Sequence, residues 1–140
     1  MKTFNFKKMF EFATLNDSRM GYSVLSEETL NCVYPYCSKM SNKRIEKKIL
    51  IYDLEGADLG SLIFNSEARK VLKVVTETVE DNYPSDTEYW VVNAPFAFTA
   101  LWAIVKRMIS DSSAKRVKVY GSGFKKDLHE KIDKSQLPDF

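Results

Sequence analysis

Three acidic side chains follow an apolar stretch near the middle of the chain. The stretch Ile49–Asp53 ends on an aspartate, and Glu55 and Asp58 come soon after it. If the stretch is a buried parallel strand, these carboxylates lie at the carboxyl edge of a sheet, where α/β proteins often bind ligands. Paired carboxylates in that place could transfer protons or hold Mg²⁺. More often, such acidic residues lie in a solvated loop and cap the following helix, and we favour this interpretation.

Basic residues form a second candidate site in the last third of the chain. Arg116, Lys118 and Tyr120 alternate with valines, so they share one face of a predicted strand. A basic patch beside an apolar helix could hold an anionic head group. A solvated surface accounts for the same residues equally well. Further basic residues lie nearby, at Lys115, Lys125, Lys126, Lys131 and Lys134.

The glycines of Gly121–Gly123 follow this predicted strand and precede a predicted helix. Such a turn can present backbone amides to a phosphate. The segment lacks the lysine and the spacing of a P-loop, and it lacks the third glycine of a dinucleotide-binding motif. We therefore favour a plain tight turn.

Residues that catalysis or metal binding would need are scarce. The single histidine, His129, lies in a lysine-rich segment, and the chain has no Gly-x-Ser-x-Gly motif, which argues against a serine hydrolase. Cys32 and Cys37 are five residues apart, which matches neither a Cys-x-x-Cys motif nor a zinc half-site. We expect no metal, no catalytic residues and no enzyme. Two free thiols suggest a reducing compartment such as the cytosol.

The overall composition predicts one domain over residues 1–140. Hydrophobic residues make up 44% of the chain and charged residues 29%, a balance that argues against disorder. The formal net charge of +2 is small for a nucleic-acid-binding protein, so we expect no nucleic-acid partner. The longest apolar run, Ala100–Val105, is far short of the roughly 20 residues of a transmembrane helix. We therefore expect a cytoplasmic protein that is at most peripheral to membranes.

Three units of strand followed by helix are predicted from Lys48 onward. The first predicted strand has consecutive apolar residues, as expected for a parallel strand buried on both faces. The alternation of strands with helices predicts a parallel sheet with right-handed crossovers. The strands are expected at 49–53, 89–93 and 117–120, and the helices at about 61–82, 97–109 and 124–132.

The first part of the chain is less regular. A helix is expected to start near Ser26, as its N-cap, and to extend to about Tyr34, before Pro35. Residues 4–15 are expected to be partly helical, so 1–32 forms an N-terminal helical segment without clear boundaries.

The predicted helix at 97–109 is unusual, since only Thr99, Lys106 and Arg107 in it are polar. A helix that is apolar nearly all round must be buried on several sides or must face lipid. This is the feature of the chain that most strongly suggests contact with lipid.

Several motifs in order resemble the core of the CRAL-TRIO domain, whose best-known members are fungal phosphatidylinositol-transfer proteins. The matching motifs are Tyr52–Gly56, Asn82–Pro84, Val91–Phe96, Pro35–Ser38, Val119–Ser122 and Leu137–Pro138, so the resemblance covers about 33–140. It implies an α/β fold with a parallel or mixed sheet, flanking helices and an apolar gating helix. It also implies a non-enzymatic module that holds one lipid in an apolar cavity and transfers it between membranes or presents it.

The same resemblance implies which residues form the site. Ser113 and Arg116 stand where phosphatidylinositol-binding members place a threonine and a lysine for the head group, and they keep the hydroxyl and the cation. Ser85 stands in place of a glutamate, and the neighbouring Asp86 could supply that carboxylate. The gate and the acyl-chain cavity would be formed by Phe96, Phe98, Leu101, Trp102, Val105 and Ile109.

The chain is short for this family at both ends, before Ser26 and after Phe140, so we expect a minimal or truncated domain. The expected partners are a phospholipid, with a phosphoinositide as one candidate, or another small hydrophobic molecule, and transiently a membrane surface. No other cofactor is expected. A reduced or occluded cavity would favour the alternative function, a non-catalytic protein-interaction or adaptor module.

Overall fold

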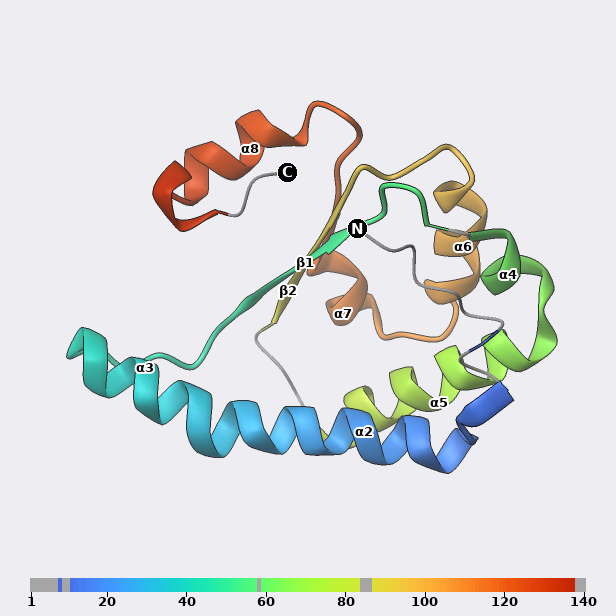
Figure 1. Cartoon of the computed structure of the whole chain (residues 1–140), viewed down its shortest axis with the longest axis horizontal. Helices are drawn as coiled ribbons and strands as arrows, with labels where there is room; N and C mark the ends of the chain where they lie inside the picture. Colours follow the sequence, from blue (N-terminus) through green and yellow to red (C-terminus); the bar gives the residue numbers. More distant parts are fainter. Residues whose placement is uncertain (1–7, 9–10, 58, 84–86, 138–140) are drawn as a thin grey trace.

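The computed structural model describes residues 8, 11–57, 59–83 and 87–137 of the chain. Within them, three parallel strands form one sheet in the order β1-β2-β3 (Figure 1). Their bounds are β1 Ile49–Asp53, β2 Glu88–Val92 and β3 Val117–Val119. Helices connect each strand to the next, and β2 pairs with both neighbours. The predicted α/β fold with a parallel sheet is therefore confirmed.

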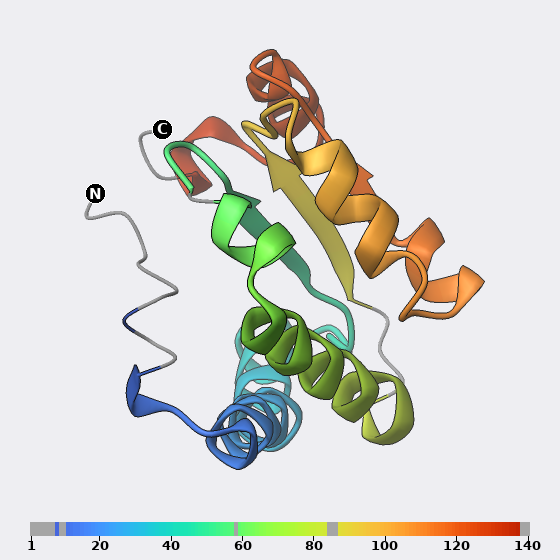
Figure 2. The same cartoon turned by 90° about the vertical axis from the view of Figure 1, so that its right-hand side faces the viewer.

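Different helices cover the two faces of the sheet (Figure 1, Figure 2). They are α8 (Phe124–Lys131) on one side, and α2 (Leu15–Glu28) and α5 (Ser66–Asn82) on the other. Side chains alternate between the two faces along a strand. Trp90 and Val92 point from β2 toward α8 and pack with Phe124 and Leu128, and each of these four side chains is at most 2% exposed. This core fixes β2, whose other face is left for the site.

The N-terminal helix starts earlier than predicted. Thr14 and Asp17 form a capping box, in which the Thr14 N–H donates to Asp17 Oδ2 at 2.8 Å and the Asp17 N–H donates to Thr14 Oγ1 at 3.1 Å. Such reciprocal bonds satisfy N–H groups that lack a partner in the first turn. The predicted start at Ser26 is wrong, because Ser26 lies inside α2, which packs along α5.

The helix α2 continues through a π-helical turn, η1 (Thr29–Val33), into α3 (Tyr34–Ser41), and Figure 1 shows them as one long rod. The π turn ends at Val33, two residues before Pro35. Proline lacks an N–H, and its ring collides with the preceding turn of a regular α-helix, so the wider turn lets the helix continue where the sequence predicted an interruption.

The predicted helix at 61–82 is two helices, α4 (Leu59–Phe64) and α5. Asn65 separates them, because its Oδ1 accepts from the Glu67 N–H at 2.9 Å and from the Ala68 N–H at 3.3 Å. Asparagine is a favoured N-cap for this reason. The cap starts α5 and thereby sets which of its faces turns toward the sheet.

The predicted apolar helix at 97–109 is also shorter than expected. It is α6 (Phe98–Val105), and a second helix, α7 (Asp111–Lys115), follows it before β3. Ser110 caps α7, since its Oγ accepts from the Ser113 N–H at 3.2 Å. Among the described helices, none has the length and apolar composition that crossing a membrane would need.

The loops at the carboxyl edge of the sheet are fixed by side-chain hydrogen bonds. Asp53 Oδ1 accepts from Asn93 Nδ2 at 2.9 Å and from the Glu55 N–H at 2.9 Å. Asp53 therefore joins two neighbouring loops, which supports its interpretation as a structural residue, while Asp58 lies outside the described residues. Within the described ranges, no group of three or more His, Cys, Asp or Glu side chains is placed to hold a metal ion. After α8, a short 3-10 turn, η2 (Lys134–Gln136), follows.

Candidate functional site

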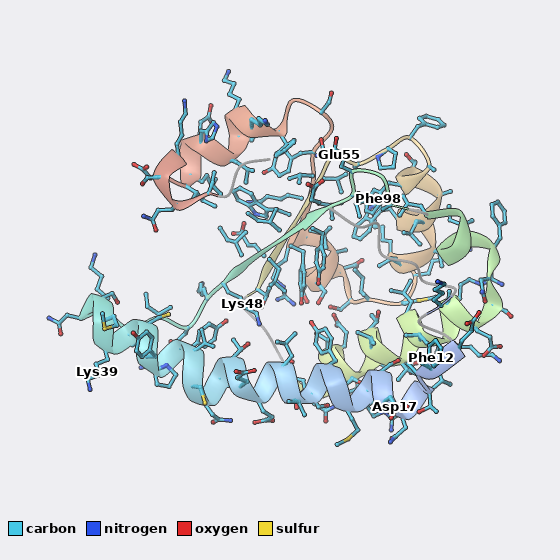
Figure 3. All side chains as sticks on the ribbon, in the orientation of Figure 1. Phe12, Asp17, Lys39, Lys48, Glu55 and Phe98 are labelled. Carbon is cyan, nitrogen blue, oxygen red and sulfur yellow. The ribbon has the colours of Figure 1, made fainter. Side chains whose placement is uncertain are left out.

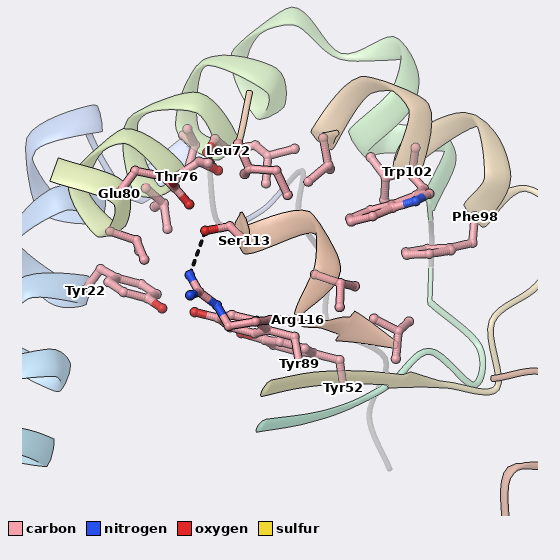
Figure 4. Close-up of a pocket in the computed structure, with 18 of the residues that line it drawn as sticks. Tyr22, Tyr52, Leu72, Thr76, Glu80, Tyr89, Phe98, Trp102, Ser113 and Arg116 are labelled. Atoms are coloured by element: carbon pink, nitrogen blue, oxygen red, sulfur yellow. Dashed lines mark hydrogen bonds between the residues drawn. The ribbon is translucent and has the colours of Figure 1, made fainter. Parts of the chain in front are cut away.

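A cavity of about 420 Å³, the first cavity, lies between the sheet and the helices α2, α5, α6 and α7 (Figure 4). Tyr89 and Val91 of β2 form part of its floor, together with Tyr52 of β1. They alternate along the strands with the residues that face α8, as the pleat of a sheet requires. Pockets for small ligands usually measure about 300–1,000 Å³, so the first cavity has room for such a ligand or for part of a lipid.

The helix α5 forms one apolar wall of the first cavity. Val71, Leu72, Val75 and Val79 line it, and they recur three or four residues apart, so they share one face of the helix. The sequence predicts this apolar face. What it faces, an open cavity rather than a filled core, follows only from the three-dimensional structure.

The helix α6 forms the opposite wall (Figure 4). Five of the six residues predicted for the gate and the acyl-chain cavity line the first cavity, namely Phe98, Leu101, Trp102, Val105 and Ile109. The rings of Phe98 and Trp102 stack with centroids 6.4 Å apart. Phe96 is different, because it precedes α6 and is 95% exposed, and it is not among the residues that line the cavity. The movement of α6 as a gate stays a prediction.

Four residues were predicted to bind the head group, and the structure describes two of them, Ser113 and Arg116. Both lie at the polar end of the first cavity. Arg116 Nη2 donates to Ser113 Oγ at 2.8 Å (Figure 4). Ser110 Oγ donates to the same oxygen at 3.1 Å. Arg116 Nε is buried, and within the described ranges it has no hydrogen-bond partner. A buried donor without a partner is unfavourable, so an oxygen atom of a ligand would be stabilised at this place.

Glu80 of α5 lies beside this arginine and serine and was missed by the sequence analysis. A hydrogen bond from the Ser113 side chain lowers the pKa of Glu80 most. Hydrogen bonds from the side chain and the backbone N–H of Ser110 and the positive charge of Arg116 lower this pKa further. The carboxylate is therefore charged near neutral pH. The predicted carboxylate neighbours of the head group, Ser85 and Asp86, lie outside the described residues, so their role stays a prediction.

Three tyrosines lie where the floor of the first cavity meets α2. The rings of Tyr52 and Tyr89 stack with centroids 6.3 Å apart and an angle of 10° between them. Burial raises the pKa of Tyr22 well above its usual range, and the neighbouring hydroxyls of Tyr89 and Tyr52 raise it further. The Tyr22 hydroxyl thus stays neutral and can donate a hydrogen bond. The sequence analysis missed Tyr22 because it placed the start of the helix after this residue.

The fold and the apolar cavity agree with the family that the sequence motifs indicate. The family model described as CRAL/TRIO domain matches residues 9–140, which is most of the chain. The chain therefore belongs to the CRAL/TRIO domain family, and the resemblance found in the sequence is confirmed.

Curated proteins similar to this chain include two phosphatidylinositol/phosphatidylcholine transfer proteins of Arabidopsis thaliana. One is 31% identical over 135 residues, which are 95% of this chain and 24% of the relative. The other is 32% identical over 130 residues, which are 91% of this chain and 23% of the relative. The Sec14 cytosolic factor of Schizosaccharomyces pombe is 25% identical over 135 residues, 94% of this chain and 46% of that protein. The chain thus spans less than half the length of each of these relatives.

Proposed function

We propose that this chain binds a phospholipid in the first cavity and transfers it between membranes or presents it at a membrane surface. The acyl chains would lie along α5 and α6, and the phosphate of the head group would lie at Ser113 and Arg116. One observation carries the proposal, an apolar cavity that ends at a buried arginine N–H without a partner among the described residues. The relatives from Arabidopsis thaliana support it, because they are phosphatidylinositol/phosphatidylcholine transfer proteins.

The chemistry of the two ends of the first cavity suits the two ends of a phospholipid. Each methylene group removed from water contributes about 0.8 kcal/mol, so the apolar walls would supply most of the binding free energy. A guanidinium group can donate two parallel hydrogen bonds to a phosphate. The carboxylate of Glu80 could accept hydrogen bonds from the hydroxyl groups of an inositol ring. Among phospholipids, a phosphoinositide is therefore the candidate that this site would favour.

In this proposal α6 is the gate. Its inner side contacts the first cavity, and Phe96 at its beginning is 95% exposed. An apolar helix can leave its cavity at low cost only where another apolar medium receives it, so we expect opening at a membrane. The protein would then be cytoplasmic and only transiently bound to membranes. The role requires no bond to be made or broken, so we propose a non-enzymatic function.

The alternative function is a protein-interaction or adaptor module, and a reduced or occluded cavity would favour it. The first cavity measures about 420 Å³ and is bounded by described residues from four helices and the sheet. An open apolar cavity of this size favours a bound ligand over the alternative.

Trp102→Asp tests the proposal in a transfer assay between donor and acceptor vesicles that contain labelled phosphatidylinositol or phosphatidylcholine. Trp102 lines the first cavity, and an unpaired carboxylate there is strongly unfavourable in contact with acyl chains. We expect transfer to fall by about tenfold or more.

Met40→Asp is the matched control, because Met40 lies in α3, away from the proposed gate, is exposed and does not line the first cavity. It adds the same charge outside the first cavity and should leave transfer near the wild-type rate. Circular dichroism should show that both variants fold. Wild-type transfer by a folded Trp102→Asp protein would contradict the proposed function.

A further inference from the structure

A second cavity, of about 310 Å³, lies next to the first. It is lined by α2, η1 and α3, by the carboxyl end of α5, and by the segments that lead into β1 and β2. Tyr22, Val79 and Tyr89 line both cavities, so these three side chains form a shared wall. A ligand in the first cavity could therefore extend into the second by passing between these three side chains.

The second cavity is more polar than the first. Side chains with hydroxyl or amide groups line it, namely Ser26, Thr29, Tyr34, Asn82, Tyr83 and Thr87. Lys48 adds a cation at the start of β1, and Figure 3 shows this lysine between β1 and the helix α2. Its ammonium donates to Thr29 Oγ1 at 3.3 Å. A cation beside hydroxyl and amide groups is an arrangement that can bind an oxyanion.

The ammonium of Lys48 forms no salt bridge with a described residue. Partial burial lowers its pKa. Glu46 also lines the second cavity, but its carboxylate is paired with Arg44 Nη2 at 2.6 Å. Glu27 lies nearby and accepts from the Tyr83 hydroxyl at 3.0 Å.

The π-helical turn places the hydroxyl that contacts Lys48. Thr29 begins η1 and is 8% exposed, and its Oγ1 donates to the Leu25 carbonyl at 2.8 Å. That bond directs the lone pairs of Oγ1 toward the lysine. Single π-helical turns are frequent at functional sites, and the position of Thr29 beside Lys48 agrees with that tendency.

We propose that the second cavity binds an oxyanion, a phosphate or carboxylate group, through the ammonium of Lys48 and the surrounding hydroxyl groups. The oxyanion could belong to the head group of an anionic phospholipid or be a free ion. The lipid source rests on the proposed function, and the free ion does not. A cation in this place attracts an anionic head group and repels the quaternary ammonium of a choline head group.

Inorganic phosphate is the first probe. It is titrated into the protein while the backbone amide NMR signals of Thr29 and Lys48 are recorded. We expect saturable shifts for the wild type and for Lys48→Arg, which keeps the charge. Lys48→Met should weaken phosphate binding by about tenfold or more. Lys47→Met is the matched control, since Lys47 is exposed and is not among the residues that line either cavity, and it should bind phosphate like the wild type.

Vesicles of equal parts phosphatidic acid and phosphatidylcholine are the second probe, with native mass spectrometry of the bound lipid. We expect the ratio of anionic to zwitterionic lipid to fall by about tenfold in Lys48→Met and to be kept in Lys47→Met. Phosphate binding that depends on Lys48, with an unchanged lipid ratio, would assign the site to a free ion.

The two proposals fail separately. A wild type that takes up neither lipid would contradict the proposed function, while the phosphate titration would still decide the role of Lys48. If Lys48→Met changes neither phosphate binding nor the lipid ratio, the oxyanion site in the second cavity is wrong.

Discussion

At the scale of single residues, the polar end of the first cavity is assembled from local bonds. Ser110 caps α7 and so positions Ser113, whose Oγ accepts from Arg116 Nη2. This bond holds the guanidinium in place and leaves its Nε as a buried donor without a partner among the described residues. Because the arginine is held before a ligand arrives, little side-chain entropy should be lost on binding.

Arg116→Met should weaken transfer of phosphatidylinositol by about tenfold or more, because it removes charged hydrogen bonds to the phosphate. Arg116→Lys should lie between this variant and the wild type, since an ammonium keeps the charge but not the two parallel donors. Lys115→Met removes an exposed neighbouring cation and serves as the control. Equal transfer rates for Arg116→Met and Lys115→Met would exclude a head-group role for Arg116.

Glu80 gives a prediction about pH. Its pKa in the folded protein is lowered from the ordinary value of 4.5, chiefly by the Ser113 side chain. A group with a lowered folded pKa stabilises the protein above its unfolded pKa, and this contribution is lost as the pH falls through the folded pKa.

The stability difference between the wild type and Glu80→Gln should therefore be largest near neutral pH and should shrink below about pH 4.5. Urea unfolding of both proteins across this range measures it. A difference that stays constant from neutral to acid pH would show that Ser113 and Arg116 do not stabilise the Glu80 carboxylate.

At the scale of secondary structure, elements with a complete pattern of their own were predictable. The strands predicted at 49–53 and 89–93 each contain a continuous apolar run, and they match β1 and, within one residue, β2. The helix α5 repeats its apolar residues at helical spacing. Asn65 was not recognised as a boundary, because an asparagine can also occur inside a helix and only its bonds to following N–H groups identify it as a cap. The helix α7 was missed because five residues are too few to show a period.

Asn65→Ala should lower the free energy of unfolding by about 1 kcal/mol, because alanine cannot accept from the first-turn N–H groups of α5. Asn65→Asp should remain close to the wild type, since a carboxylate oxygen can cap the same groups. Chemical denaturation of the three proteins gives these values. Equal stability of the alanine and aspartate variants would show that Asn65 does not determine where α5 begins.

At the scale of the whole molecule, the site joins segments that are far apart in the sequence. Motif spacing was enough to select Ser113, Arg116 and most of the α6 residues, because these lie within one stretch of the family pattern. It could not select Tyr22 or Glu80, which line the first cavity from α2 and α5, outside that stretch.

Phe96 was predicted to line the cavity but does not. It lies within the family motif and next to the apolar segment, yet its side chain is exposed because it precedes the first turn of α6. Side-chain direction at a helix start depends on the backbone of the preceding loop, and a residue pattern does not specify that backbone.

Native mass spectrometry of the protein isolated without detergent is the most direct test of a phospholipid in the first cavity. We predict a mass increment of one phospholipid per chain for the wild type and for Met40→Asp, identified as phospholipid after extraction, and its loss from folded Trp102→Asp. A wild-type protein of ligand-free mass that also fails to acquire phospholipid from phosphatidylinositol and phosphatidylcholine vesicles would contradict the account.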